Sequence, residues 1–357
     1  MSNEYVDSFG SYDIYDGVNL STITASGHSL RRRWNGTGNG GACYCVADGL
    51  LIGFGGALYK TLTHQSKWTL GVRIKMDATP FVGGGELFTF GNCGTPLCSL
   101  IVNNDGSITI KGWGQSSTNT IFSCGPIIIA DTLTYVELSA TLSGTTNINC
   151  AVELFINGVS QGTANANINR AITDITSGDA TFNQLTLSSG VVNNGQCIYK
   201  DLYLNNGQGS VNTGALGPVI IDAYPLPNAD GSETSWVPDT GTTHYTRINE
   251  NPADEDTSYV KSATVGDKDS YGWQNLVSLT DTIDAVQLTY LARVDAEGAR
   301  SFRGTIGDHG LEAQTQTYGL SWDYIYNHQS FDLDPNGNIA WTPANFNAKE
   351  FGLELMS

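Results

Sequence analysis

Two groups of residues in this 357-residue sequence have types and spacing that could support binding. In the first, Asp332, Asp334 and Asn336 alternate ahead of Gly337, a pattern of oxygen ligands and a turn-making glycine that is typical of calcium loops. The pattern lacks the glutamate expected at the twelfth position, and Pro335 stiffens its centre. A β-turn without a metal explains the same residues. Calcium at Asp332, Asp334 and Asn336 is therefore one of two interpretations, and no other cofactor is expected.

The second group could bind a glycan. Trp113 lies in a short run with two glycines, and an exposed indole ring can stack on a sugar. Asn103 and Asn104 precede it in a polar loop, and their amides both donate and accept hydrogen bonds. The alternative is a tryptophan in a core or subunit contact and a plain hairpin turn at Asn103-Asn104-Asp105-Gly106. Trp113, Asn103 and Asn104 are the candidate ligand-binding residues.

The cysteines favour free thiols over a metal site. All seven lie before residue 200, their number is odd, and the first residues, MSNEYVDSFG, do not form a signal peptide. Cys43-x-Cys45 and Cys93-x4-Cys98 lack the usual Cys-x2-Cys spacing of zinc sites. We expect partly buried thiols in a reducing compartment, the cytoplasm of the cell that makes the protein.

The elements that position these residues are predicted to be strands. The 42 glycines and only 15% charged residues fit an all-β chain with many turns. Residues 67–76 alternate apolar and polar side chains, as a half-buried strand does. Residues 100–110 predict a hairpin around Asp105-Gly106, and residues 150–159 predict another around Asn157-Gly158. We expect two antiparallel β-sandwich domains of jelly-roll type, at 1–215 and 216–357, joined by a short stiff connector.

The second domain is predicted to begin with the proline-rich stretch GPVIIDAYPLPNAD, in which Pro218 to Asp222 would form the first strand. Residues 283–294 then alternate in the strand pattern, Asp295 to Gly298 make a turn, and residues 299–306 return as a partner strand. Thr342 followed by Pro343 predicts the start of one short helix.

Charge and hydropathy exclude two classes of partner. From Pro218 onward the sequence has 21 acidic and 7 basic residues, a net charge of −14, which leaves −4 of the total −18 for the first part. Such an acidic half is repelled by phosphate backbones, so nucleic-acid binding is not expected. No stretch of 18 apolar residues occurs, so no membrane span is expected.

Strand and turn motifs in the first domain resemble those of concanavalin-A-like or laminin-G-like jelly rolls. The resemblance covers residues 5–207 and rests on KWTLGVRIKM, TYVELSATL, VELFINGVSQG and YKDLYLNN. The opening Asp7-Ser8-Phe9 and the later Arg33-Trp34-Asn35 are similar to jelly-roll modules of tailed-phage virion proteins. The resemblance is specific for the fold and weak for activity.

A second resemblance covers residues 217–357. The motifs W-x-P, DEDTSYV, GDKDSY, VQLTYLARVDAEGARSFR, FDLDPNGNIAWT and GLEL are similar to a C-terminal β-sandwich module of phage structural proteins. This resemblance implies a location in a virion, other virion proteins as partners, and a homo-oligomer such as a trimer or ring.

The jelly-roll fold also hosts lectins and glycosidases. Its glycosidases place two carboxylates on one strand as nucleophile and acid. Glu4, Glu86, Glu137 and Glu153 are the only glutamates before residue 217, and none has such a partner. The five histidines are scattered and suggest no triad. We therefore expect a non-enzymatic structural protein of a phage virion, in a tail fibre, spike or surface decoration. The alternatives are an adhesin that binds a host surface glycan and, less favoured, a polysaccharide-degrading enzyme.

Overall fold

The computed structural model describes residues 3–7, 35–37, 43–46, 49–53, 56–76, 85–189, 196–221, 225–251, 253–276, 282–308 and 311–357. The chain divides into a larger unit, Val6–Ile221, and a smaller unit, which consists of Asp222–Ser357 together with Asn3–Tyr5. The boundary predicted between residues 215 and 216 lies six residues before this division.

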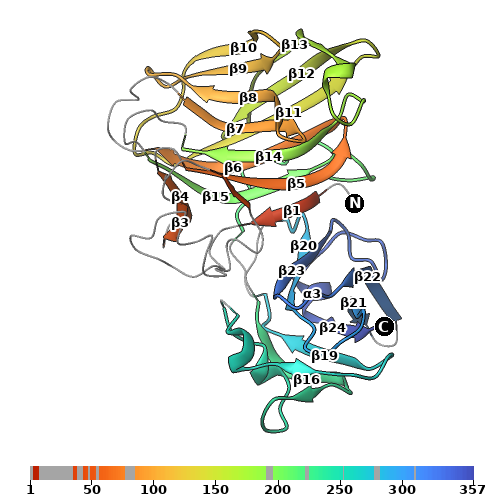
Figure 1. The fold of residues 1–357 in the computed structure, drawn as a ribbon. Coiled ribbons are helices and arrows are strands. Elements are labelled where there is room, and N and C mark those ends of the chain that lie inside the picture. Colours follow the sequence, from red (N-terminus) through yellow and green to blue (C-terminus); the bar gives the residue numbers. More distant parts are fainter. Residues whose placement is uncertain are drawn as a thin grey trace. The chain divides into compact units, whose positions relative to one another are not determined.

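The larger unit is a sandwich of two antiparallel sheets (Figure 1). Sheet A contains, in spatial order, β13 (Val159–Ala171), β12 (Asn147–Ile156), β11 (Thr134–Ser143), β6 (Lys67–Met76), β15 (Gln196–Asn205), β4 (Gly49–Gly53) and β3 (Cys43–Val46), with β1 (Asn3–Asp7) beside β15. Sheet B contains β10 (Thr118–Pro126), β9 (Ser107–Trp113), β8 (Thr95–Val102), β7 (Gly85–Asn92), β14 (Phe182–Ser188), β5 (Ala57–Gln65) and β2 (Asn35–Thr37). A 3-10 turn, η1 (Ile172–Asp174), follows β13.

Alternation along the strands builds the core between the sheets. In β12 every second side chain, from Ile148 to Ile156, is buried, and β9 alternates in the same way. Phe88, Phe90 and Phe182 are fully buried, and Phe90 packs against both of the others. The predicted strand at 67–76 is confirmed as β6, and the two predicted hairpins are confirmed as the β8–β9 and β12–β13 pairs.

Residues 213–221, here called the strap, follow the last strand of sheet A without forming a strand. The Arg73 guanidinium donates to the carbonyl of Val219 at 3.4 Å, and the Ile221 amide donates to Asp201 Oδ1 at 3.2 Å. Both partners belong to sheet A. The prediction that Pro218 to Asp222 opens the second fold is therefore wrong for its described residues 218–221, because side chains of the first unit hold this backbone.

The smaller unit has its own core. Its largest sheet, sheet C, has the order β16 (Pro227–Thr234), β19 (Lys268–Trp273), β24 (Glu350–Leu355), β21 (Ser301–Asp308) and β22 (Leu311–Gly319). Two pairs complete it: β17 (Val237–Pro238) with β18 (Val260–Lys261), and β20 (Val286–Ala292) with β23 (Ile325–Phe331). Short helical turns are η2 (Tyr245–Arg247), η3 (Glu255–Thr257) and α3 (Pro343–Asn347). Leu288, Ile306, Phe331, Trp341, Phe346 and Phe351 form the core.

Two local predictions for this unit have different outcomes. The helix start at Thr342 is confirmed, since its hydroxyl accepts a hydrogen bond from the amide of Asn345 at 3.2 Å and caps α3. The prediction of a hairpin between residues 283–294 and 299–306 is wrong, because β20 pairs with β23 and β21 pairs with β22 and β24. Both strands exist, but their partners are distant in sequence. Among the described residues, no helix is long and apolar enough to cross a membrane.

Candidate functional site

The outer side of sheet B carries a row of polar side chains, here called the open face. Strand register places Lys111, Ser99, Thr89, Thr186 and Tyr59 side by side on five successive strands, from β9 to β5. These positions alternate with the buried apolar residues of the same strands, so the row faces away from the core. Lys111, Thr186 and Tyr59 are half-buried at this face, whereas Thr89 is 9% exposed and Ser99 is fully buried, so solvent reaches only part of the row.

Hydrogen bonds join Trp113 to this row. The indole Nε1 of Trp113 donates to Ser99 Oγ at 2.7 Å, and Ser99 Oγ lies 2.8 Å from Thr89 Oγ1. Thr89 Oγ1 in turn donates to Glu86 Oε2 at 3.4 Å. The bond to Ser99 fixes the orientation of the Trp113 ring, which remains half-buried. One aromatic side chain and one carboxylate thus lie at the two ends of a hydrogen-bonded chain.

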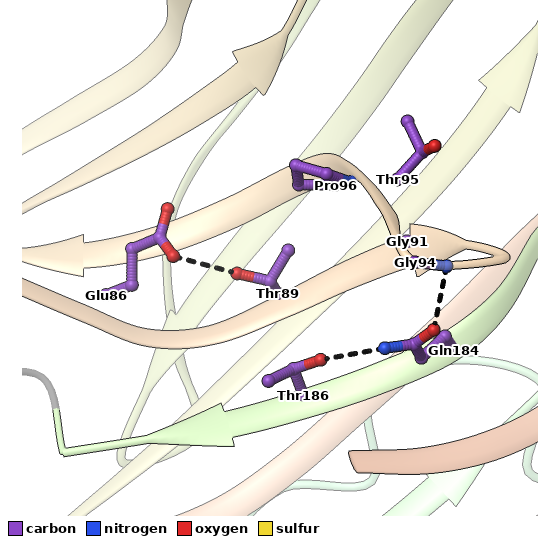
Figure 2. A pocket seen from close by; sticks show the side chains of 8 residues that line it. All are labelled: Glu86, Thr89, Gly91, Gly94, Thr95, Pro96, Gln184 and Thr186. Carbon is purple, nitrogen blue, oxygen red and sulfur yellow. Dashed lines mark hydrogen bonds between the residues drawn. The ribbon is translucent and has the colours of Figure 1, made fainter. Parts of the chain in front are cut away.

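A pocket of about 160 Å³ opens beside this chain (Figure 2). Its lining mixes polar and apolar surface and consists of Glu86, Thr89, Gly91, Gly94, Thr95, Pro96, Gln184 and Thr186. Gln184 spans it, accepting from the Gly94 amide at 3.0 Å and donating to Thr186 Oγ1 at 3.3 Å. Gly91 allows the backbone at Thr95 to come close, because a Cβ there would lie 2.7 Å from the Thr95 carbonyl oxygen.

The chemistry of the pocket suits a ligand rich in hydroxyl groups. Threonine hydroxyls and the Gln184 amide can both donate and accept. Glu86 Oε1 is buried and has no hydrogen-bond partner in the structure, so it can accept a hydrogen bond from a bound hydroxyl group. Among the residues that the structure describes, no group of three or more His, Cys, Asp or Glu side chains is placed to hold a metal ion.

Asn103 and Asn104 lie at the other end of β9 from Trp113. Asn103 Nδ2 donates to Ser107 Oγ at 3.0 Å and to Thr109 Oγ1 at 2.9 Å, while Asn104 is exposed in the turn. Asp105 closes the turn, and hydrogen bonds from Ser107 lower the pKa of its carboxyl group. Six residues of strand separate the asparagines from Trp113, about 20 Å at the usual rise. The three predicted residues therefore belong to one strand and its turn but not to one small site.

The predicted calcium residues form a turn whose charge is already paired. Asp334 Oδ1 accepts from the Asn336 amide at 3.0 Å, and the turn closes between Asp334 and Ile339. Asp334 Oδ2 lies 3.0 Å from Lys349 Nζ, and both side chains are almost completely buried. Asp332 is 7% exposed. A calcium ion at Asp334 would have to displace the Lys349 ammonium group, so its binding here stays a prediction.

A second polar cluster lies on the outer side of sheet A, beneath the strap, and is here called the covered face. Glu137 Oε1 accepts hydrogen bonds from the Tyr203 hydroxyl at 2.6 Å and from the amides of Leu216 and Gly217 at 3.0 and 2.9 Å. Glu137 is fully buried. Tyr203 lies flat over Gly71, where a Cβ would overlap the ring. These side chains therefore use their hydrogen bonds to hold the chain's own backbone.

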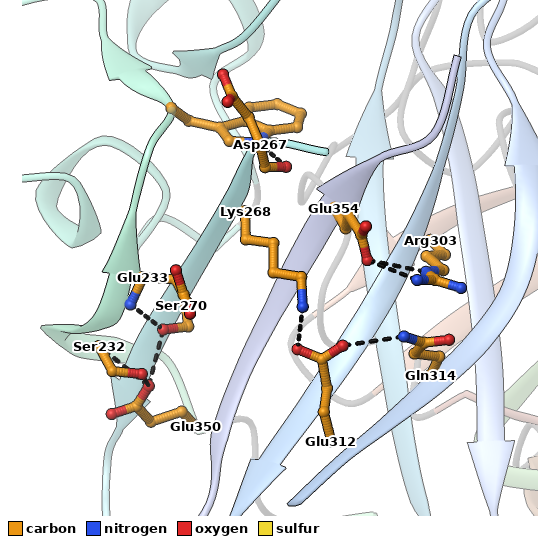
Figure 3. Close-up of polar contacts among 11 residues, drawn as sticks. Ser232, Glu233, Asp267, Lys268, Ser270, Arg303, Glu312, Gln314, Glu350 and Glu354 are labelled. Atoms are coloured by element: carbon orange, nitrogen blue, oxygen red, sulfur yellow. Dashed lines mark hydrogen bonds and ion pairs between the residues drawn. The ribbon is translucent and has the colours of Figure 1, made fainter. Parts of the chain in front are cut away.

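Charges on the smaller unit also pair with each other. On sheet C, Lys268 Nζ lies 2.7 Å from Glu312 Oε2, and Arg303 Nη2 lies 2.8 Å from Glu354 Oε2 (Figure 3). The Lys268 ammonium group helps to lower the pKa of Glu312 against the opposing effect of burial. These two ion pairs bring together four of the charged side chains of the sheet.

Histidine contributes one buried contact that sequence spacing did not suggest. His244 Nδ1 lies 2.9 Å from Asp269 Oδ2, and the Tyr271 hydroxyl donates to the same oxygen at 2.5 Å. Burial raises the pKa of Asp269 despite these hydrogen bonds. The contact joins the residue before η2 to β19.

Comparison with known proteins gives partial structural similarities and no sequence match. No protein-family model matches the chain, and no curated protein matches its sequence. Among solved structures, alginate lyase Aly36B in complex with alginate trisaccharide is 13% identical, with a TM-score of 0.41, over 57% of this chain and 98% of the lyase. The PL-14 alginate lyase from Aplysia kurodai is 13% identical, with a TM-score of 0.40, over 57% of this chain and 99% of the lyase. The carbohydrate-binding module CBM66 from Bacillus subtilis is 10% identical, with a TM-score of 0.33, over 48% of this chain and 94% of the module.

These similarities concern the fold alone. The predicted all-β class with antiparallel sandwich sheets is confirmed. The prediction that the protein is not an enzyme is contradicted, because several of the similar structures are polysaccharide lyases. The missing pair of carboxylates argues against a glycosidase, but it does not argue against a lyase.

Proposed function

We propose that the larger unit binds a polysaccharide chain along the open face, with Trp113 and the pocket at Thr89 and Gln184 as its main contacts. The observation that carries this proposal is the hydrogen-bonded chain from Trp113 through Ser99 and Thr89 to Glu86, of which Thr89 and Glu86 line a pocket together with Gln184. An extended polyhydroxyl ligand matches a line of hydroxyl groups better than an apolar ligand does, because each buried polar group needs a partner.

The length of the face favours a polymer over a single sugar. Trp113 lies on β9 and Gln184 on β14, with β8 and β7 between them. A ligand that contacts both must cross three strand spacings, about 14 Å. Asn103 and Asn104 lie at the other end of β9, about 20 Å from Trp113, so they are not among the main contacts of this proposal.

The test is direct binding to soluble polysaccharides. The full chain would be run in native gels that contain alginate as an acidic polymer or dextran as a neutral one. We expect retardation by at least one polymer and a loss of affinity of about tenfold or more in Trp113→Ala, equivalent to about 1.4 kcal/mol. The matched control is Trp322→Ala, which removes a 59% exposed tryptophan from the smaller unit and should leave binding unchanged. No retardation by any polymer would refute the proposal.

Cleavage can be followed in the same mixtures. A lyase breaks a uronate chain by removing a proton next to the carboxylate and leaves a carbon–carbon double bond in the product. Ultraviolet absorbance of that double bond in alginate would show whether binding is accompanied by elimination, and a reducing-end assay covers hydrolysis of either polymer.

The location in a phage virion, the virion partners and the trimeric or ring assembly rest on the sequence resemblance and remain proposals. In that setting the open face would bind a host surface glycan, and the smaller unit would pack against other virion proteins. Imaging of particles labelled with an antibody against this chain tests the location, and light scattering of the purified protein tests the assembly.

A further inference from the structure

Cys93 occupies an unusual position in the two-residue turn between β7 and β8. Asn92 pairs with Thr95, so Cys93 and Gly94 form the turn, and both have a positive φ, of 48° and 84°. Tight hairpin turns of this kind favour asparagine, aspartate or glycine at the first of these positions, because other side chains are strained there. The turn itself therefore does not explain a cysteine, whose side chain is exposed and free.

Asn183 on β14 holds this turn from the neighbouring strand. The Cys93 amide donates to Asn183 Oδ1 at 2.7 Å, and Asn183 Nδ2 donates to Cys93 Sγ at 3.2 Å. Asn183 itself is only 7% exposed. One buried side-chain amide thus binds both the backbone and the sulfur of Cys93, so a hydrogen-bond donor is aimed at an accessible thiol.

His64 on β5 fixes the direction of that donor, because β14 lies between β5 and β7 in sheet B. Asn183 Oδ1 is bonded to the Cys93 amide, so its Nδ2 faces His64 Nε2, which lies 3.1 Å away and must accept. The ring proton is then on Nδ1, 3.2 Å from Thr181 Oγ1, which donates to Asp179 Oδ1 at 2.7 Å. His64, Thr181 and Asp179 thus form a chain of hydrogen bonds behind Asn183.

The geometry assigns Cys93 as a nucleophilic thiol that exchanges with small disulfides, with Asn183 stabilising its thiolate and His64 positioning Asn183. With glutathione disulfide as the co-reactant, the thiolate attacks one sulfur, the S–S bond breaks, and a mixed disulfide forms at Cys93. The released glutathione thiolate takes a proton from water. Cys93 is oxidised in this step, and one half of the glutathione disulfide is reduced.

The role of Asn183 gives a rate pattern that a purely structural role would not give. An N–H donor to sulfur raises the fraction of thiolate at neutral pH, but a stabilised thiolate is also the weaker nucleophile. Asn183→Ala should therefore exchange about threefold more slowly at pH 7 and about threefold faster at pH 9.5, where most of the thiol is ionised in both proteins.

The experiment uses the full chain with Cys124→Ser, which removes a half-buried thiol, and glutathione disulfide in excess. Intact mass follows the gain of one glutathione at pH 7 and pH 9.5, and the part of the gain that is lost in Cys93→Ser is the reaction of Cys93. Asn183→Asp keeps the oxygen that binds the Cys93 amide and loses the donor, so it should also slow exchange at pH 7 and serves if Asn183→Ala does not fold.

Two further variants test the positioning role and the specificity of the effect. His64→Ala should change the rates in the same directions as Asn183→Ala, and His64→Gln, whose amide oxygen can also accept from Asn183, should restore them. The matched control is Asn119→Ala on β10, whose amide donates to the Asn167 carbonyl, and its rates should be unchanged. A mass gain that Cys93→Ser does not reduce, equal rates with and without Asn183, or a change in the same direction at both pH values would overturn the inference.

Discussion

The two outer faces of the larger unit carry similar polar residues and use them in opposite ways. On the covered face, Glu137 and Tyr203 bind the amides of the strap and are buried with them. On the open face, Glu86 and Thr89 line a pocket. Each glutamate keeps one carboxylate oxygen without a partner, but only Glu86 lines a pocket. The comparison teaches that a carboxylate on a sheet face supports the fold where the chain covers it and supplies donors, and is available to a ligand where it lines a pocket.

The largest expected difference between the faces is in stability. Glu137→Ala removes the acceptor of two strap amides and the Tyr203 hydroxyl, and leaving such groups buried without partners should lower the free energy of unfolding by about 3 kcal/mol. Glu86→Ala removes one long hydrogen bond and an unpartnered oxygen, so it should lower the free energy of unfolding by under about 1 kcal/mol. Urea unfolding of the full chain measures both.

A second control comes from the same sheet. Glu153 lies on β12 opposite Ser139 and is half-buried, so Glu153→Ala should change the unfolding free energy by under about 0.5 kcal/mol. Equal losses in Glu137→Ala and Glu86→Ala would mean that the strap is not held as described. Faster proteolysis within residues 213–221 in Glu137→Ala would support release of the strap.

Local patterns in the sequence predicted the strands but not which strands pair. The hairpins around Asp105-Gly106 and Asn157-Gly158 are confirmed because a tight turn fixes its two strands by itself. The pairing of β20 with β23 depends on packing between residues about 40 positions apart, so the adjacent strand was wrongly chosen. The strap was misassigned because its apolar residues resemble a strand, while the side chains that hold it lie up to 146 residues away.

The covered face should also make the fold sensitive to alkali. Burial, and then the negative charge of Glu137, raise the pKa of Tyr203 above its usual value. The stabilisation by the neutral Tyr203 hydroxyl is therefore complete below pH 10, the pKa of about 10 that a tyrosine has in the unfolded chain. Above that pH the free energy of unfolding should fall by about 1.4 kcal/mol per pH unit on account of Tyr203. In Tyr203→Phe this part of the fall should be absent, which urea unfolding across the alkaline range measures. An unchanged slope would contradict the burial of Tyr203.

The candidate site was only partly visible in the sequence. Trp113 was identified because an exposed indole ring in a glycine-flanked run could stack on a sugar, and the structure links it through Ser99 to Thr89, which lines the pocket. Thr89, Gln184 and Glu86 were missed, since their proximity depends on the register of β14 against β7, which joins residues about 95 positions apart. The available signal was hydroxyl residues spaced for one face of β8 (Thr95 and Ser99) and of β14 (Thr186 and Ser188).

A smaller effect is expected at the pocket wall. Gln184→Ala removes the side chain that bonds Gly94 and Thr186, and should weaken polysaccharide binding about fivefold, the equivalent of one hydrogen bond of about 1 kcal/mol. The control is Gln161→Ala on β13 of sheet A, whose amide bonds a neighbouring carbonyl group, and it should bind normally. Affinity electrophoresis compares them, and equal losses would place the ligand elsewhere.

The smallest expected effect comes from modification of a single thiol. Cys93 is exposed in the β7–β8 turn next to Gly94, so a maleimide adduct there should weaken binding less than Gln184→Ala does. Burial raises the pKa of Cys43 to about 12, so this thiol should stay protonated and unmodified at pH 8 in the folded protein. Mass spectrometry of the labelled protein in a Cys124→Ser background checks the site, and a Cys93→Ser variant should bind equally well before and after treatment.

The central claim is that the open face binds polysaccharide and the covered face does not. Hydroxyl-radical footprinting of the full chain, with and without the polymer that retards it, tests this most directly. The account predicts that the polymer protects Trp113 from oxidation, while Trp322 and residues 213–221 are oxidised equally in both samples. Oxidation of Trp113 that does not change with polymer, or protection confined to residues 213–221, would contradict it.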